Sequence, residues 1–136
     1  MRTTVIRIIA VGSLLSMSMA ISAHHGFSAE YSISAQVSFR GEVTSVEWTN
    51  PHVLIFVLEK DANGTAQEWR VEGGTIKVLT QNGWTAEMLR QLVTSKIPVT
   101  ITGYRARKKQ STDGSHVNGA WAKTVELPDG RSLAFN

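Results

Sequence analysis

Histidine placement is the feature of this sequence with the clearest chemistry. The four histidines are His24, His25, His52 and His116. The first two are adjacent and follow an apolar leader, whereas His52 comes directly after Asn50 and Pro51 in a predicted turn. The neutral imidazole of histidine is the commonest metal ligand in proteins. Three of the four histidines lie at two places, the end of the apolar leader and the predicted turn. We therefore predict a transition-metal site formed by His24, His25 and His52.

The first 23 residues have the composition of a secretory signal peptide. Two arginines form a basic beginning, Ile8–Leu15 is a short apolar stretch, and small residues follow up to Ala23. The apolar stretch is too short for an ordinary membrane span, although an uncleaved anchor is the alternative interpretation. Cleavage after Ala20, Ser22 or Ala23 satisfies the small-residue rule. We therefore expect a periplasmic protein that begins at one of three positions.

The cleavage point decides which chelate the new terminus can form. After cleavage behind Ala23, the terminal amine and the ring of His24 can chelate one metal ion, and His52 or His25 can supply a third nitrogen, a T-shaped set that suits Cu(II). After cleavage behind Ser22, His25 stands third in the chain, where it can bind Cu(II) or Ni(II) in a square plane with the amine and two backbone amides. Cleavage behind Ala20 would place three residues before the pair and weaken the chelate.

The metal site has a plain structural alternative. His24 and His25 can be no more than a polar beginning of the mature chain, and His52 can cap backbone groups of its turn without any metal. If a metal binds, nitrogen donors favour copper or nickel over magnesium or calcium, which prefer oxygen. Possibilities based on sulfur are excluded, because the chain has no cysteine and only Met88 follows the leader.

Length and charge indicate one small domain without a nucleic-acid partner. The chain has 136 residues and a formal net charge of +3. Removal of the leader takes away Arg2 and Arg7 but no acidic residue, so the mature charge is nearer to neutral. Residues 24–136 are enough for one hydrophobic core. We expect no binding of nucleic acid, because the chain is exported and lacks a strongly basic balance.

The stretch from Val37 to Glu59 predicts the hairpin on which the domain is built. β-Branched and aromatic residues dominate both arms. The apolar positions change parity along the first arm, which predicts a β-bulge near Thr44–Ser45 and a long strand that can bend. The second arm is apolar on both parities, which is typical of a central strand covered on both faces.

The rest of the chain predicts a mainly β, small OB-fold-like barrel of five to six strands. Further strands are expected at 67–72, 97–104, 120–127 and 132–135, with Glu72 on the exposed face of its strand. Thr75 and Thr85 are expected to cap two short helices inserted between strands three and four. Residues 105–119 are expected to form a polar loop. Residues 24–36 form a separate N-terminal segment in this scheme, anchored by two aromatic rings, and the barrel domain occupies 37–136.

A weaker ligand site is predicted where the basic loop, the Arg- and Lys-rich start of the predicted loop at 105–119, borders the usual ligand face of an OB fold. It would suit an acidic glycan, a phosphate or a lipid headgroup, and the protein would then be an envelope accessory or adaptor domain with no metal. A solvated loop is the structural alternative, and the four tryptophans are expected mainly in core or rim packing. No catalytic constellation is complete, so we expect no enzyme activity. The residues of this weaker site are Trp48, Asn50, Arg105, Arg107, Lys108 and His116.

Several short motifs together resemble a known family. They are Ala-His-His-Gly-Phe at 23–27, Gly-Glu-Val at 41–43, Glu-Trp-Thr-Asn-Pro-His at 47–52, Gly-Trp at 83–84 in the helical insert, and Leu-Pro-Asp-Gly at 127–130. This combination resembles a family of small exported bacterial proteins classed as a domain of unknown function. The resemblance covers essentially the whole mature chain. It implies an exported OB-like domain and carries no established activity.

Overall fold

The architecture is taken from a computed structural model, which describes residues 22–112 and 115–136. Residues 1–21, most of the predicted signal peptide, lie outside the described part. The elements in chain order are α1 (Ser22–Glu30), β1 (Tyr31–Glu47), β2 (Leu54–Lys60), β3 (Ala66–Glu72), α2 (Ile76–Gln81), α3 (Ala86–Ser95), β4 (Val99–Ala106), β5 (Gln110–Thr112), β6 (Ser115–Glu126) and β7 (Ser132–Ala134).

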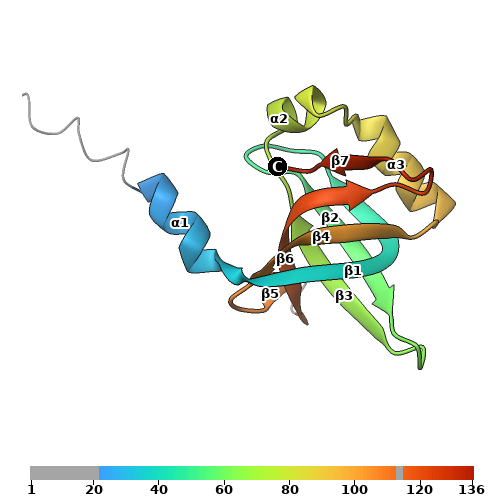
Figure 1. Ribbon diagram of the computed structural model, residues 1–136, viewed down its shortest axis with the longest axis horizontal. Helices are drawn as coiled ribbons and strands as arrows, with labels where there is room; N and C mark the ends of the chain where they lie inside the picture. Colours follow the sequence, from blue (N-terminus) through green and yellow to red (C-terminus); the bar gives the residue numbers. More distant parts are fainter. Residues whose placement is uncertain (1–21, 113–114) are drawn as a thin grey trace, which may run out of the picture.

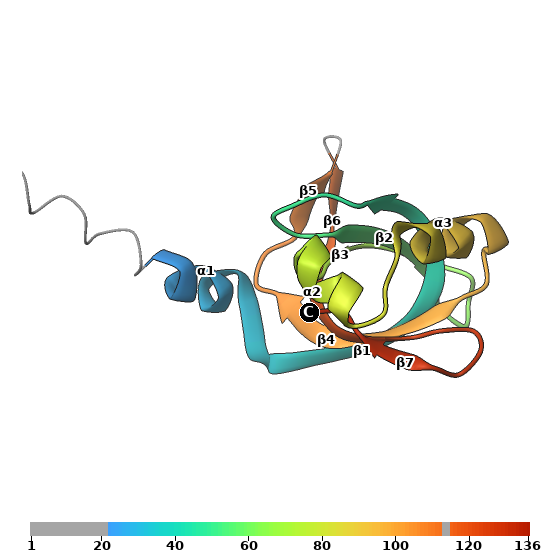
Figure 2. The same cartoon turned by 90° about the horizontal axis from the view of Figure 1, so that it is seen from above.

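The strands close into a ring, as Figure 2 shows from above. β1 pairs with β2 on one side and with β4 on the other, β2 continues to β3, and β4 continues to β6, all antiparallel. Parallel pairing of β3 with β6 closes the ring. The helices α2 and α3 are inserted between β3 and β4 and lie at the same end of the ring as the C-terminus (Figure 1). This confirms the predicted mainly β, OB-like architecture with a helical insert.

β1 can serve two neighbours because it bends in the middle. Its first half pairs with β4 and its second half with β2, and Gly41 pairs with both. A Cβ atom at Gly41 would approach the carbonyl oxygen of Leu58 to 2.6 Å, so the bend depends on glycine at this point. The register shift between Val43 and Ser45 confirms the predicted bulge.

The core fills the interior of the ring and extends under the helical insert. Within the closed sheet, the aromatic side chains of Phe39 and Trp69 stack with 4.1 Å between their centroids. Under the insert, Trp84 is fully buried, donates from Nε1 to the carbonyl of Ala134 at 2.8 Å and packs edge-on against Phe135. The prediction of core packing is therefore confirmed for Trp69 and Trp84.

Two boundaries differ from the sequence prediction. The expected polar loop at 105–119 contains β5 and the start of β6, which form a hairpin with Gln110 opposite Val117. This hairpin is polar apart from buried Val117, so it has no apolar alternation by which it could be recognised. The first strand begins at Tyr31 rather than Val37, because Tyr31 pairs with Ala106 across an irregular stretch of β1.

Candidate functional site

The centre of the candidate site is a buried carboxylate at the end of β3. Glu72 is only 9% exposed, so the prediction that it faces solvent is wrong. The reason is its register: Glu72 pairs with Leu54, the first residue of β2, and therefore lies against the turn that leads into β2. That turn contains the cis peptide bond between Asn50 and Pro51, followed by His52.

Three side chains surround the carboxylate of Glu72. Nδ1 of His52 lies within hydrogen-bonding distance of Oε1. The hydroxyl of Tyr31 donates to Oε2 at 2.5 Å, and Nη1 of Arg70 lies 3.4 Å from the same oxygen. A buried charge is tolerated when it is paired and hydrogen-bonded, and Glu72 meets both conditions. The cluster therefore combines the carboxylate of Glu72, the imidazole of His52 and the phenol of Tyr31 in a partly buried environment.

Tyr31 is the most enclosed member of this cluster, at 2% exposed. Burial raises the pKa of its hydroxyl far above the usual value, and the hydrogen bond to Glu72 together with the negative charge of that carboxylate raises the pKa further. Tyr31 therefore stays protonated and acts as a permanent donor to Glu72.

His52 is held with one ring nitrogen inward and the ring edge accessible. Because an ionised carboxylate can only accept, a neutral His52 ring donates to Glu72 from Nδ1 and then carries its lone pair on Nε2. The side chain of His52 is 40% exposed, and its ring stands edge-on to Trp121 at 5.1 Å between centroids. A histidine that donates its other nitrogen to a carboxylate is the usual arrangement of a metal ligand.

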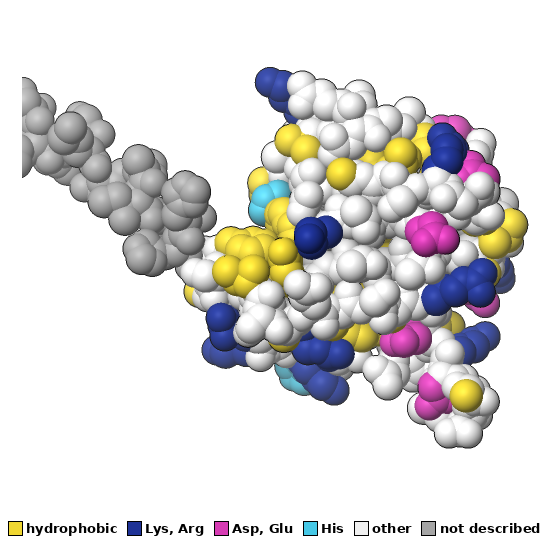
Figure 3. All heavy atoms as spheres, in the orientation of Figure 1, with side chains coloured by type: hydrophobic (Ala, Val, Ile, Leu, Met, Phe, Trp, Pro, Cys, Tyr) yellow, Lys and Arg dark blue, Asp and Glu magenta, His cyan; other side chains and the backbone are white. Residues whose placement is uncertain are grey.

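Helix α1 reaches the same place through aromatic packing. The ring of Phe27 lies 5.3 Å from Trp121, 5.4 Å from Tyr31 and 6.3 Å from Tyr104, measured between centroids. Figure 3 shows hydrophobic side chains gathered where the leading helix meets the ring of strands, with a histidine at their edge. Trp121 contacts both Phe27 and His52, so α1 is attached beside the His52–Glu72 pair.

His24 and His25 lie on α1, and their side chains are outside the described part of the structure. Among the side chains that the structure describes, no three or more of His, Cys, Asp and Glu are grouped closely enough to hold a metal ion. Of the three predicted ligands, the geometry thus describes His52 with its carboxylate and the backbone that carries the other two.

Two residues of the weaker predicted site have structural roles. Trp48 packs against the core cluster. Oδ1 of Asn50 accepts a hydrogen bond from the backbone of Ile76 at 3.2 Å, at the beginning of α2. Neither side chain is therefore directed at the basic loop.

The basic residues of the weaker site divide into separate contacts. The guanidinium of Arg105 lies 4.9 Å above the ring of Trp69. Arg107 donates from Nε to the carbonyl of Ser28 at 2.8 Å and from its backbone nitrogen to that of Glu30 at 2.7 Å, so it fastens the end of α1. His116 is exposed on β6. The six residues therefore do not converge on one site.

Lys108 belongs to a hollow that borders Glu72. This hollow has a volume of 480 Å³, and its walls are formed by Ala29, Glu30, Arg70, Glu72, Lys108 and Gln110. Arg70 and Glu72 were missed as functional candidates because alternation along their strand assigned them to the solvent face. The available signal was the position of Glu72 at a strand end, directly before two glycines.

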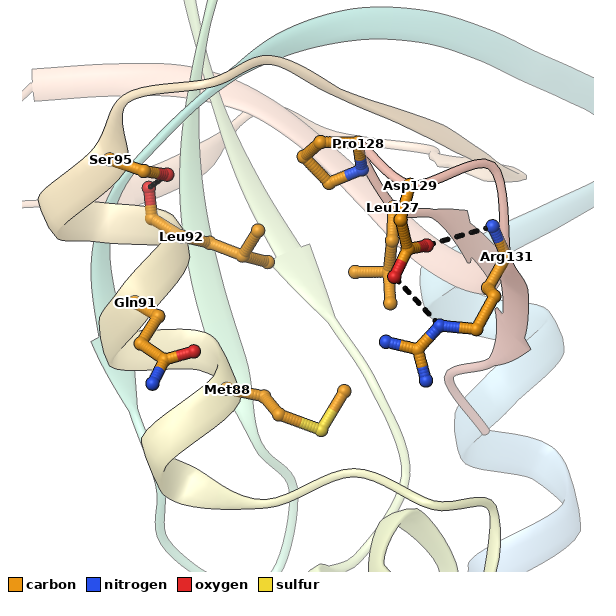
Figure 4. A pocket seen from close by; sticks show the side chains of 8 residues that line it. All are labelled: Met88, Gln91, Leu92, Ser95, Leu127, Pro128, Asp129 and Arg131. Atoms are coloured by element: carbon orange, nitrogen blue, oxygen red, sulfur yellow. Dashed lines mark hydrogen bonds and ion pairs between the residues drawn. The ribbon is translucent and has the colours of Figure 1, made fainter.

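A second hollow lies between α3 and the turn from β6 to β7 (Figure 4). Its volume is 260 Å³. Asp129 and Arg131 point toward each other at its edge, with Nε of Arg131 2.8 Å from Oδ2 of Asp129. The backbone and side-chain hydrogen bonds from Arg131 lower the pKa of Asp129. The charges of Asp129 and Arg131 thus compensate each other, and no histidine lines this second hollow.

Together these features define a small β protein of OB-like architecture, with a cluster of a buried glutamate, a buried tyrosine and a partly exposed histidine beside an N-terminal helix. The chain belongs to DUF6152, a family of unknown function, whose model matches residues 11–115. This match confirms the resemblance to a domain of unknown function. No curated protein and no solved structure matches the chain. In the described part of the chain, no helix has the length and apolar character needed to cross a membrane.

Proposed function

We propose that this protein is a periplasmic, non-enzymatic binding protein that holds Cu(II) through His24, His25 and His52. The observation that carries the proposal is the contact between His52 and Glu72. A buried carboxylate that accepts a hydrogen bond from Nδ1 leaves Nε2 as a ready metal ligand and holds the ring in one orientation.

The position of α1 supports the participation of the N-terminal pair. Phe27 attaches this helix to Trp121, which also contacts His52. Cleavage after Ala23 would make His24 the first residue, so its amine and ring nitrogen would add two donors. Nitrogen donors of this kind select copper over hard cations.

Copper titration of the mature protein tests the proposal. The full chain is expressed in a host that can export it, and the N-terminal mass of the recovered protein is measured. Cu(II) is then added to the metal-free form up to one equivalent while the visible spectrum is recorded. We expect a d–d band that saturates at one equivalent. The variant His52→Ala removes a ligand, and Glu72→Gln removes the partner that orients it, so both should weaken copper binding by about ten- to a hundredfold.

His116→Ala is the matched control, because this histidine is exposed on β6 and belongs to no contact with Glu72. It should bind copper as the wild type does. Absence of a d–d band at one equivalent would remove the metal proposal. Equal affinity of His52→Ala and the wild type would restrict binding to the terminus and contradict the three-histidine site.

A further inference from the structure

The hollow beside Glu72 contains charged groups of both signs. Its volume of 480 Å³ lies within the range of about 300–1,000 Å³ that is typical of small-molecule sites. Arg70 and Glu72 come from β3, Lys108 comes from the connection between β4 and β5, and Glu30 comes from the end of α1. These two cations and two anions cancel, so the walls carry no formal net charge.

Of the two charged residues that β3 contributes to the hollow, Glu72 has its partners within the protein, whereas Arg70 keeps free hydrogen-bond donors. Glu72 already has His52, Tyr31 and Arg70 as partners. Nη1 of Arg70 lies 3.4 Å from Glu72 and 3.4 Å from Oε1 of Gln110, which are long hydrogen bonds. A guanidinium has five N–H donors in a planar fork, so Arg70 retains donors for a carboxylate in the hollow.

The two outer charges are opposite in sign and do not pair. Lys108 and Glu30 are both exposed and line the same hollow. The salt bridges between described residues are His52–Glu72, Arg70–Glu72, Arg90–Glu87 and Arg131–Asp129, which leaves both side chains without an ion-pair partner in that part of the chain. Each is therefore available to a ligand that enters between them.

We propose that this hollow binds a small zwitterion, with its carboxylate on Arg70 and Lys108 and its ammonium group on Glu30. Free α-amino acids and short peptides both have this chemistry. A simple anion would gain little, because the carboxylates of Glu30 and Glu72 oppose it. The proposal does not require copper, which would bind at His52. The ring of His52 contacts Oε1 of Glu72, whereas Arg70 contacts Oε2.

The test is an NMR titration of the metal-free, chelator-treated full mature protein. The probes are L-alanine and tri-L-alanine, and their blocked forms are N-acetyl-L-alanine, which lacks the ammonium group, and L-alaninamide, which lacks the carboxylate. We expect saturable shifts at residues around the hollow with at least one of the two zwitterions below about 10 mM. Loss of the carboxylate should weaken binding by about tenfold, and loss of the ammonium group by about two- to fivefold. The zwitterion that binds more tightly identifies the source, free amino acid or peptide.

Substitutions at the exposed wall residues locate the site without disturbing the buried cluster. Lys108→Ala and Glu30→Gln should each weaken binding by about two- to fivefold. Lys109→Ala is the matched control, because Lys109 is the adjacent exposed lysine and does not line the hollow. It should leave the affinity unchanged.

Three outcomes would overturn the proposal. Tighter binding by Glu30→Gln would indicate an anion site in place of a zwitterion site. An equal loss in Lys109→Ala and Lys108→Ala would indicate diffuse attraction to the basic loop. No saturation by either zwitterion at about 50 mM would show that the hollow does not take this class of ligand.

Discussion

Glu72 brings a negative charge into a nearly closed environment, and its neighbours make this possible. Removing a carboxylate from water costs several kcal/mol unless hydrogen bonds and opposite charge replace the lost hydration. Tyr31 supplies a neutral donor, Arg70 a cation, and His52 a donor that stays in contact with solvent. The proposed orientation of His52 depends on this set.

The variant Tyr31→Phe tests the contribution of the hydroxyl. It removes one donor to a buried carboxylate and keeps the ring, so we expect a loss of about 1–3 kcal/mol in the free energy of unfolding near pH 8. Urea denaturation measures it. The free energy of unfolding of Tyr31→Phe should also fall less steeply at alkaline pH than that of the wild type.

Burial and Glu72 raise the pKa of Tyr31 in the folded protein, whereas the unfolded chain ionises near the ordinary value of 10.0. The folded state therefore binds more protons above that pH, and its stability falls as pH rises through and beyond 10. Arg70 lowers this pKa and Glu30 raises it, as smaller contributions. Below pH 10 the contribution of Tyr31 is fully present. In Tyr31→Phe, this part of the alkaline decline should disappear.

Tyr104→Phe is the control for both effects. Its ring belongs to the same aromatic group around Phe27, and its hydroxyl has no hydrogen-bond partner among the described residues. It should keep nearly wild-type stability at pH 8 and the wild-type alkaline slope. A Tyr31→Phe protein as stable as Tyr104→Phe would show that the hydroxyl bond to Glu72 contributes little.

At the scale of elements, two residues attach the described part of α1 to the strands. Phe27 supplies the apolar contact, and Arg107 binds two carbonyl groups near the end of the helix. An isolated helix of nine residues is marginal in water, so its stability must come from this attachment.

The variant Phe27→Ala should therefore release α1 and leave the ring of strands folded. We expect amide hydrogen exchange across the residues of α1 that the mature protein retains, up to Glu30, to accelerate by about tenfold or more, because local opening free energies set exchange rates. Ile33→Ala is the control, since Ile33 lies in the same leading part of the chain and is 58% exposed. Wild-type exchange of α1 in Phe27→Ala would contradict the anchoring role and weaken the case for a copper site that includes His24.

At the scale of the whole molecule, ring closure requires strands β4 and β6 to approach closely at one point. The pairing of β4 with β6 shifts register between Thr102 and Gly103. A Cβ atom at Gly103 would lie 2.0 Å from the carbonyl oxygen of Trp121. Backbone would have to move to accept it, and this backbone belongs to two strands of the closed ring.

Gly103→Ala should therefore destabilise the protein by about 2–4 kcal/mol or prevent folding. Thermal and urea unfolding measure the first result, and recovery of soluble protein measures the second. Gly26→Ala is the matched control, because nothing lies within 4 Å of a Cβ atom at this helical position. It should fold with unchanged or slightly raised stability. Wild-type stability of Gly103→Ala would mean that the strand crossing is looser than the structure describes.

Local features of the fold were predictable because they depend on neighbours in the chain. The parity change along β1 predicted the bulge at Val43–Ser45. Thr75 and Thr85 accept hydrogen bonds from the backbone of Val78 and Met88, as helix caps should. The glycine at position 130 adopts a positive φ of 87° in the predicted turn.

The sequence by itself determined the strands apart from β5 and the first part of β1, together with the bulge and the helix caps, since periodicity and turn chemistry act over a few residues. Only the tertiary structure decided that Glu72 is buried and meets His52 and Tyr31, which are 20 and 41 residues away along the chain. Those contacts depend on the register of β3 against β2 and on where β1 begins. Register is set by packing of whole strands, so alternation along β3 alone assigned Glu72 to the wrong face.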